Sequence, residues 1–411
     1  MKRIILFLSF IICIINNAYT QSQNCDCKAD LTFLDSKIRK TPAFKNNKKA
    51  YQDSYSKFSK EAVSIKSLYE CYVLMNELMI PLNDNHSRVY GINLGATEAV
   101  IADPEKYSTF KNSALFNTYP KSSINLDSLK RVLANKPKLD IEGVYKAEDY
   151  ITIGVFKSKD DRIYKAIILD SNKNLWKAGE IIYTMIPFGN EYLLNIGGKI
   201  NSKRLIAYPE RIENGIFQTM GYKKDITQIN YASKMPSDST YYREELSDKV
   251  TYLKIGSFNS WYPTLSDAEK FYKSLEGNLQ KPNLIIDLRN NGGGGDRNSD
   301  ILYDILKDYA KNNKIYLITN HNTVSNAEQF TYKLNKLENC EIFGSRSNGR
   351  LAYEIKNGNY PLPCDNFIAV LTSKKHGEFL EFESQGIEPN VKLDMGSDWI
   401  IQVKNYISNE N

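Results

Sequence analysis

The stretch LIIDLRNNGGGG, residues 284–295, is an apolar run that ends in polar residues and then in four consecutive glycines. The apolar part predicts a buried β-strand. Four glycines give up side-chain packing and cost backbone entropy on folding. A chain tolerates this where the backbone adopts unusual dihedral angles or approaches another molecule closely. The stretch therefore predicts a strand that leads directly into a functional loop.

A second strand-to-helix junction follows about thirty residues later. The apolar run KIYLIT, residues 314–319, leads into NTVSNAEQF, residues 322–330. Hydrolases place a nucleophilic serine at such a junction, where N–H groups at the helix start can hold an oxyanion. Ser325 has this position, and the two loops together predict an acyl-transfer site. Ser325 is also predicted as a helix N-cap, with Glu328 completing a Ser-x-x-Glu capping box, and the two roles do not exclude each other.

The region around these junctions alternates strands and helices, which predicts an α/β domain with a largely parallel sheet and crossover helices. Further upstream, apolar spacing from residue 29 to about 79 is helical, and three β-rich runs lie between about 141 and 231. The predicted division is a signal peptide at 1–20, an N-terminal helical region at 21–138, a β-rich module at 139–235 and an α/β catalytic domain at 236–411.

The first twenty residues are typical of a secretory signal. Lys2 and Arg3 precede an apolar run from residue 4 to 15, and small residues around Ala18 offer a cleavage site. The run of about twelve residues is too short to span a bilayer. No lipobox precedes Cys25. The sequence therefore predicts export to the periplasm or the extracellular space without a membrane span, leaving about 390 residues for two or three domains.

Charge and cysteine content narrow the function further. The formal charge of +6 falls to +4 without Lys2 and Arg3, and acidic and basic residues alternate, which predicts no nucleic-acid partner. Five cysteines remain after cleavage, and an oxidising compartment allows disulfides between them. Cys340 and Cys364 flank what we expect to be neighbouring strands and could pair, but the sequence does not determine which cysteines pair. A lone Cys-x-Cys predicts neither a zinc site nor another cofactor.

A nucleophilic serine requires a base, and the chain has three histidines. His321 lies on the Ser325 loop and is also consistent with a surface residue. His376 follows two lysines in what we expect to be a solvated turn. His86 is far upstream, but catalytic groups occur in any chain order. Spacing alone leaves the choice among the three open.

Four motifs occur in an order that resembles the tail-specific, or C-terminal processing, serine peptidases. The resemblance covers residues 250 to about 393 and extends to the loop around His86 and to the Cys25-Asp26-Cys27 start, which resembles secreted Bacteroidetes members. It implies a ClpP/crotonase-like spiral for the catalytic domain and a peptide or unfolded chain end as substrate. The motifs are DLRNNGGG at 287–294, TVSNAE at 323–328, GSRSNG at 344–349 and ESQGIEP at 383–389.

The family has two catalytic styles, and the residues here resemble the second. A processing-protease branch uses a lysine in a Gly-Lys-Gly segment, but Arg350 stands there and arginine does not act as a base. The tricorn-core branch uses Ser, His and Glu. The resemblance therefore implies Ser325 as nucleophile, His86 as general base and acid, and Glu383 as the residue that orients the imidazole. A histidine base predicts that the rate falls below about pH 6.

The resemblance also implies an oxyanion hole formed by backbone N–H groups of Gly292 or Gly293 and of Asn326. Three positions depart from the family pattern: Asn326 replaces alanine, Asn390 replaces aspartate, and Asn85 replaces a serine. A catalytically silent binding protein that carries an apolar ligand or a peptide is the alternative function, since interphotoreceptor retinoid-binding proteins use the same modules. Cleavage specificity, oligomeric state and the role of the β-rich module are not predicted.

Overall fold

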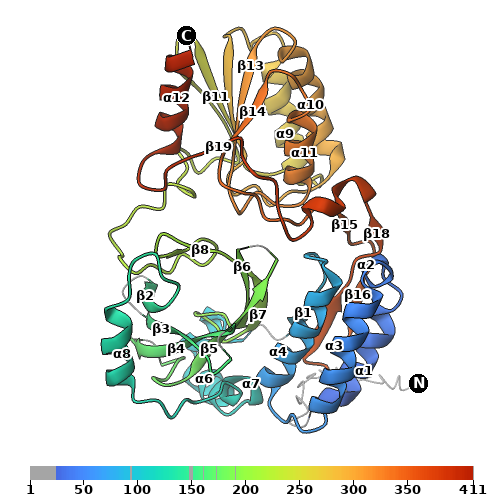
Figure 1. Cartoon of the computed structure of the whole chain (residues 1–411), viewed down its shortest axis with the longest axis vertical. Coiled ribbons are helices and arrows are strands. Elements are labelled where there is room, and N and C mark those ends of the chain that lie inside the picture. Colours follow the sequence, from blue (N-terminus) through green and yellow to red (C-terminus); the bar gives the residue numbers. More distant parts are fainter. Residues whose placement is uncertain are drawn as a thin grey trace, which may run out of the picture.

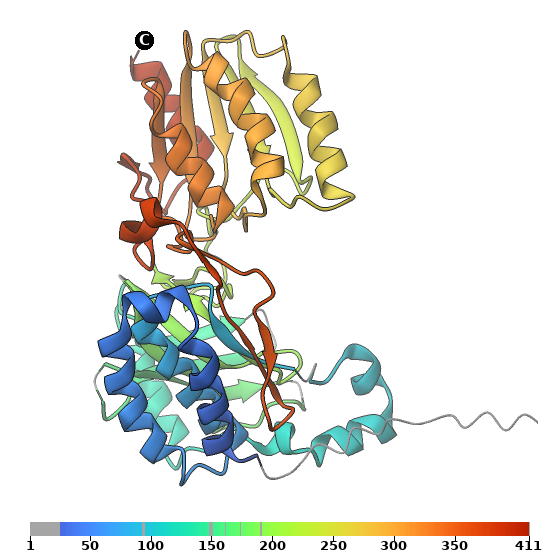
Figure 2. The same ribbon diagram turned by 90° about the vertical axis from the view of Figure 1, so that its right-hand side faces the viewer.

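The computed structural model describes residues 25–92, 95–147, 151–160, 162–172, 174–189 and 191–410. The predicted signal peptide lies outside these residues. The described chain forms an α/β half and a second half that combines an antiparallel sheet with the N-terminal helices (Figures 1 and 2).

The α/β half contains a six-stranded sheet in the order β10-β11-β12-β13-β14-β19. Its neighbouring strands from β11 through β12, β13 and β14 to β19 pair in parallel, and β10 is antiparallel to β11. The predicted largely parallel sheet is confirmed. Helices α9, α10 and α11 cover one face and α12 covers the other (Figure 1). The bounds are β10 Tyr241–Ser247, β11 Val250–Ile255, α9 Thr264–Leu275, β12 Asn283–Asp287, α10 Asp296–Tyr309, β13 Lys314–Thr319, α11 Asn326–Leu334, β14 Cys340–Gly344, β19 Val391–Lys392 and α12 Trp399–Glu410.

Burial on both faces explains why the strands of this sheet are apolar almost throughout. In β12, Leu284 and Ile286 belong to the large core that includes the α9–α11 side. Ile285, between them, belongs to a smaller core with Trp399 and Val403 of α12. Because parallel strands end at the same edge of a sheet, the loops that follow β12 and β13 are brought together there.

A second six-stranded sheet, entirely antiparallel, has the order β2-β3-β4-β5-β6-β7. It lies within the residues predicted to be β-rich. Helix α4 (Leu68–Met79) contacts β6 and β7, and α8 (Leu126–Ala134) contacts β2 and β3. The bounds are β2 Gly143–Ala147, β3 Ile151–Lys157, β4 Tyr164–Ser171, β5 Ile181–Phe188, β6 Tyr192–Gly198 and β7 Leu205–Glu210.

A third sheet joins distant parts of the chain. Strand β1 (Arg88–Gly91) pairs with β17 (Phe367–Val370), which pairs with β16 (Asn359–Pro361). These late strands reach from the α/β half to the N-terminal helices (Figure 2). The Cys340–Cys364 disulfide that the sequence allowed does not form: Cys340 begins β14, whereas Cys364 lies just before β17, which belongs to a different sheet. The disulfides are Cys25–Cys364 and Cys27–Cys71, and Cys340 is a free thiol.

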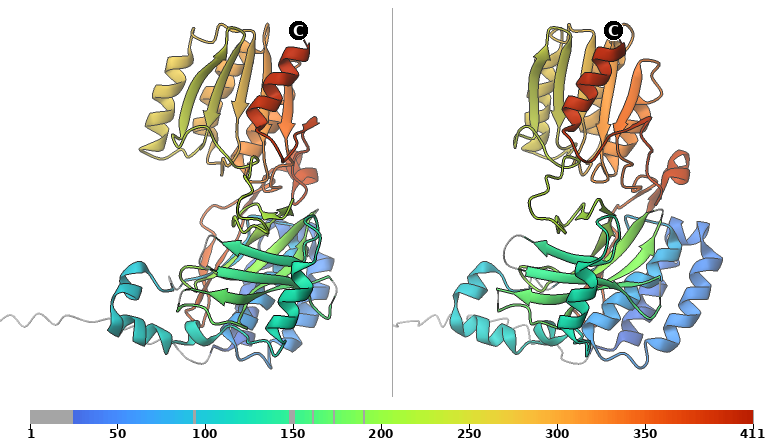
Figure 3. Two further views of the ribbon diagram at one scale, coloured as in Figure 1. Left: turned by 90° about the vertical axis from the view of Figure 1, so that its left-hand side faces the viewer. Right: turned by 60° about the vertical axis from the view of Figure 1, so that its left-hand side comes forward.

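The remaining elements are short or connect these parts, and α5–α7 project to one side of the antiparallel sheet (Figure 3). Within the described ranges, no helix is long and apolar enough to cross a membrane. The elements are α1 Cys27–Ile38, α2 Pro42–Asn46, α3 Lys48–Glu61, η1 Ile80–Leu82, α5 Glu98–Ala102, α6 Pro104–Lys111, α7 Ala114–Asn117, β8 Ile212–Glu213, β9 Ile216–Phe217, β15 Tyr353–Glu354, β18 Lys374–Lys375 and η2 Gly377–Phe382.

Candidate active site

Ser325 stands at the turn between β13 and α11, in a strained backbone conformation. Its φ of 60° and ψ of −122° are rare for a residue with a side chain. The Ser325 N–H donates to Glu328 Oε2 at 2.9 Å, which is the glutamate half of the predicted capping box. The strain and this bond present the hydroxyl at the junction, as nucleophile-bearing turns do.

His86 is the histidine that contacts Ser325. Its Nε2 lies 3.1 Å from Ser325 Oγ, although the two residues are 239 positions apart in the sequence. His321 is buried and bonded through Nε2 to Thr219 Oγ1 at 2.9 Å, which corrects the expectation of a surface residue. His376 lines the same cavity as Ser325 but lies 3.2 Å from a Glu354 oxygen. The geometry therefore selects one of the three histidines.

The surroundings of His86 favour the neutral imidazole. Its pKa is well below the usual value because burial disfavours the charged form, and Arg350, Arg88 and His376 add to this effect. Asp84 fixes the loop by accepting from the N–H groups of His86 and Ser87 at 3.0 and 3.1 Å. A neutral imidazole with an available Nε2 is the form that can accept the serine proton.

Glu383 lies beside His86 but bonds to backbone N–H groups. Ligand-type atoms of Asp84, His86 and Glu383 lie within 4.8 Å of one another. The Glu383 carboxylate accepts from the N–H of Asn85 at 2.7 Å, and His86 Nδ1 has no hydrogen-bond partner within the described chain. Burial and then Asp84 raise the pKa of Glu383 to about 8, against the opposing effect of its N–H donors. In this structure Glu383 thus binds the backbone of the histidine loop and makes no hydrogen bond to the imidazole ring of His86.

The predicted oxyanion donors are only partly available. Gly293 has a φ of +89°, and a Cβ there would lie 2.9 Å from Ser325 Cβ, so a side chain does not fit. Its N–H donates to Asn291 Oδ1 at 2.9 Å, which corrects the prediction that this group is free for an oxyanion. Gly292 is exposed, and Asn326 is the first residue of α11, where helices leave N–H groups unpaired. The roles of Gly292 and Asn326 stay predictions.

A cavity of about 440 Å³ opens beside Ser325 and His86. Gly294, Gly295 and Asn326 also line it. Ionisable side chains also line it: Lys374, His376 and Lys356 approach Glu354 at 3.0, 3.2 and 3.6 Å. This polar lining suits a peptide better than an apolar ligand.

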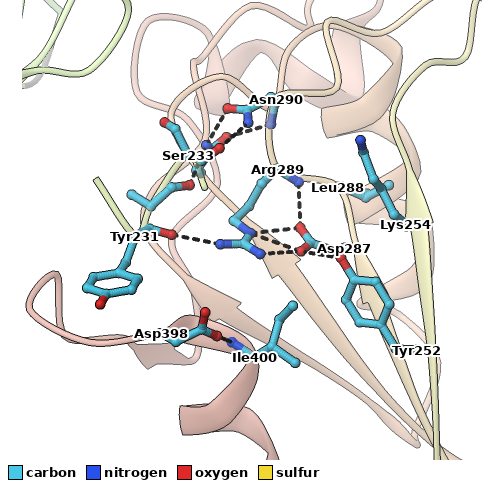
Figure 4. Close-up of polar contacts among 12 residues, drawn as sticks. Tyr231, Ser233, Tyr252, Lys254, Asp287, Leu288, Arg289, Asn290, Asp398 and Ile400 are labelled. Carbon is cyan, nitrogen blue, oxygen red and sulfur yellow. Dashed lines mark hydrogen bonds and ion pairs between the residues drawn. The ribbon is translucent and has the colours of Figure 1, made fainter. Parts of the chain in front are cut away.

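The polar residues before the glycines have a structural role (Figure 4). Asp287 and Arg289 form a buried ion pair, and the Tyr252 hydroxyl donates to Asp287 at 2.9 Å. Arg289 also donates to the Tyr231 carbonyl at 2.7 Å, and Asn290 to the Ser233 carbonyl at 2.9 Å (Figure 4). These contacts join the residues before the glycine loop to the chain that leads from the antiparallel sheet to β10.

Sequence reasoning missed the second role of Glu328. Its carboxylate is fully buried and also accepts from Ser347 Oγ at 2.6 Å and from the N–H groups of Gly349 and Arg350 at 2.6 and 2.9 Å. Burial raises its pKa, against the effect of these donors. The Ser-x-x-Glu spacing was the available signal, but it pointed only to a local cap.

Two described groups bring together side chains of the kind that bind metals. In the first, Asp30 lies beside Cys25 and Cys364, whose sulfurs form a disulfide. In the second, the carboxylates near His86 accept N–H and O–H groups of the protein. Most donor atoms in the two groups therefore already have covalent or hydrogen-bond partners, whereas Asp30 Oδ2 and His86 Nδ1 have none within the described chain.

Comparison with protein families gives one match. Residues 249–309 match Peptidase family S41. The matched segment runs from β11 to α10 and includes the glycine loop, whereas Ser325 and His86 lie outside it. The match and the Ser325–His86 pair together support a serine-type peptidase.

Comparison with known proteins adds only weak likenesses. A putative peptidase from Parabacteroides merdae is 13% identical, with 94% of this chain and 97% of that chain covered and a TM-score of 0.42. Mature CPAF complexed with lactacystin is 12% identical, with 94% and 99% covered and a TM-score of 0.48. The photosystem II D1 C-terminal processing protease is 12% identical, with 91% and 98% covered and a TM-score of 0.37. No curated protein matches. TM-scores below 0.5 carry no argument about this chain.

Proposed function

We propose that this chain is an exported serine endopeptidase that cleaves peptides or unfolded C-terminal segments through an acyl-enzyme at Ser325. The observation that carries the proposal is the 3.1 Å approach of His86 Nε2 to Ser325 Oγ, at a strained strand-to-helix turn beside a cavity. A tricorn-core-like Ser-His-Glu site, a ClpP/crotonase-like spiral and a secreted Bacteroidetes-type origin belong to the same proposal.

The reaction divides into two acyl transfers. Ser325 Oγ attacks the peptide carbonyl while His86 Nε2 takes the hydroxyl proton. His86 then gives that proton to the leaving amine, the C–N bond breaks, and an ester remains on Ser325. A water molecule, deprotonated by His86, hydrolyses the ester and releases Ser325 with its proton restored.

Two further groups support the transition state in this scheme. N–H groups of Asn326 and of Gly292 hold the oxyanion, as expected for donors at a helix start and on a glycine loop. Glu383 orients the histidine loop through the Asn85 N–H. A binding protein for an apolar ligand receives no support from the cavity, because such a ligand would face the charged groups around Glu354. A silent peptide-binding protein is the alternative that the labelling and cleavage test distinguishes.

The test uses the mature protein, a serine-reactive fluorophosphonate and a denatured protein substrate. We expect wild type to be labelled and to cleave, and Ser325→Ala to do neither. Ser274→Ala, which alters an exposed serine of α9, is the matched control and should behave as wild type. If the wild-type protein is not labelled and does not cleave the substrate, the proposed peptidase activity is contradicted.

Tail-directed cleavage and export are separate parts of the proposal. Peptides with a free C-terminus should be cleaved faster than the same peptides with an amidated C-terminus, and equal rates would remove the tail preference. The mass of the protein recovered outside the cytoplasm should correspond to a chain that starts at Gln21. A full-length mass would contradict the predicted signal cleavage.

A further inference from the structure

Residues 349–352, called here the amide segment, donate four consecutive backbone N–H groups to two buried carboxylates. The first two N–H groups donate to Glu328 and the next two to Glu383. Both glutamates are at most 1% exposed. The distances are 2.6 Å from Gly349, 2.9 Å from Arg350, 3.0 Å from Leu351 and 2.7 Å from Ala352.

Each carboxylate also holds one of the two catalytic loops. Glu328 Oε2 accepts from the Ser325 N–H at 2.9 Å. Glu383 Oε1 accepts from the Asn85 N–H, directly before His86, at 2.7 Å. Glu328 therefore connects the serine loop to the amide segment, and Glu383 connects the histidine loop to the next residues of the same segment.

Side-chain contacts strengthen the link on the histidine side. Arg350 Nε donates to the Asn85 carbonyl at 2.9 Å, and Asn85 Nδ2 donates to the Gly349 carbonyl at 3.3 Å. Gly349 has a φ of +79°, and a Cβ there would lie 2.7 Å from the Gly386 nitrogen, so the segment fits closely between its neighbours. A buried donor that loses its acceptor is costly, which makes this arrangement stiff.

We propose that Glu328 is a positioning residue of the peptidase reaction: through the amide segment it fixes Ser325 Oγ relative to His86 Nε2. The inference rests on the proposed function and assigns Glu328 a role equivalent to that of Glu383, from the serine side. Displacement of reacting groups by about 1 Å can cost roughly a hundredfold in rate, so the stiffness of this link has a catalytic consequence.

Glu328→Gln is the central variant, because an amide keeps the shape but presents an NH₂ group to N–H donors. We expect kcat to fall about 10- to 100-fold, by loss of positioning, while KM changes less than about threefold. Glu338→Gln, at an exposed glutamate ten residues later, is the matched control and should keep wild-type kcat. If Glu328→Gln does not fold, Ser347→Ala removes one donor to the same carboxylate and should lower kcat with KM maintained.

A double-mutant cycle separates positioning from a general structural effect. If Glu328 acts through the Ser325–His86 pair, its substitution should cost less than about threefold in a His86→Ala background, because interacting sites are non-additive. Equal factors with and without His86, or full activity of Glu328→Gln, would overturn the role of Glu328. A wild type that is not labelled by fluorophosphonate would instead overturn the proposed function itself, and with it this role.

Discussion

The loops that follow β12 and β13 start at equivalent ends of neighbouring parallel strands but use their polar residues differently. After β12, Asp287 and Arg289 bond to each other and to a distant carbonyl, within the protein interior. After β13, Ser325 has positive φ, and it lines the cavity together with His86, to which it is hydrogen-bonded. A polar residue at a strand end thus contributes to the candidate active site only when one of its polar groups lines the cavity and is not used in bonds within the protein interior.

The most severe test of this comparison is on the β13 side. His86→Ala should lower kcat by about 10²–10⁴, the usual contribution of general base catalysis, with little change in thermal stability. Fluorophosphonate labelling rates and turnover measure the effect. A fully active His86→Ala protein would refute the Ser–His pair.

The matching test on the β12 side should affect stability. Asp287→Ala leaves the Arg289 charge buried and unpaired, which typically costs about 3–5 kcal/mol in free energy of unfolding. Chemical denaturation measures this cost. The control is Asp308→Ala, which removes an exposed ion pair with Lys311 and should change the free energy of unfolding far less. An equal loss of unfolding free energy in the two variants would contradict the structural role assigned to the loop after β12.

The pH dependence of the rate sharpens the comparison further. A histidine of ordinary pKa is roughly three-quarters protonated at pH 6. The pKa of His86 lies well below the ordinary value, so its neutral form persists to lower pH. We therefore expect kcat/KM to hold below pH 6 as well, in contrast to the fall below about pH 6 that sequence alone predicts. A midpoint of 6.5 or higher on the acid limb would contradict the burial of this imidazole.

The smallest effects should come from the lysines beside the cavity. Lys374→Ala removes an ion pair with Glu354 that is half exposed, and Lys375→Ala removes a surface contact with Asn46. Neither lysine contacts Ser325 in the structure, so each variant should change kcat by less than the roughly 10² expected for His86→Ala. Collapse of activity in either variant would instead favour a Ser–Lys mechanism.

Sequence was most informative where the determinants are local. The apolar runs before Asp287 and Ser325 predict their strands, and the following glycines and Ser-x-x-Glu spacing predict the turns. His86 was not distinguishable from His321 by spacing, because the contact closes a loop of more than two hundred residues. Resemblance to a family supplied that choice, and the 3.1 Å distance agrees with it.

The missed features all depend on long-range pairing. The β1–β17 pairing joins residues near 90 to residues near 368, and neither short run has a sequence feature that identifies its partner strand. The Cys25–Cys364 disulfide likewise joins residues 339 positions apart, so spacing did not reveal that Cys364 pairs with Cys25 and not with Cys340. The amide segment has no side-chain signature at all, since its contacts are made by backbone N–H groups.

The β1–β17 pairing has a consequence for the order of events during synthesis. Strand β1 begins two residues after His86, yet its partner is made almost three hundred residues later. A chain emerging from its N-terminus cannot complete this sheet, or the Cys25–Cys364 bond, until residues 364–370 have been made. The loop that carries His86 would then be fixed in place only after Ser325 itself has been synthesised.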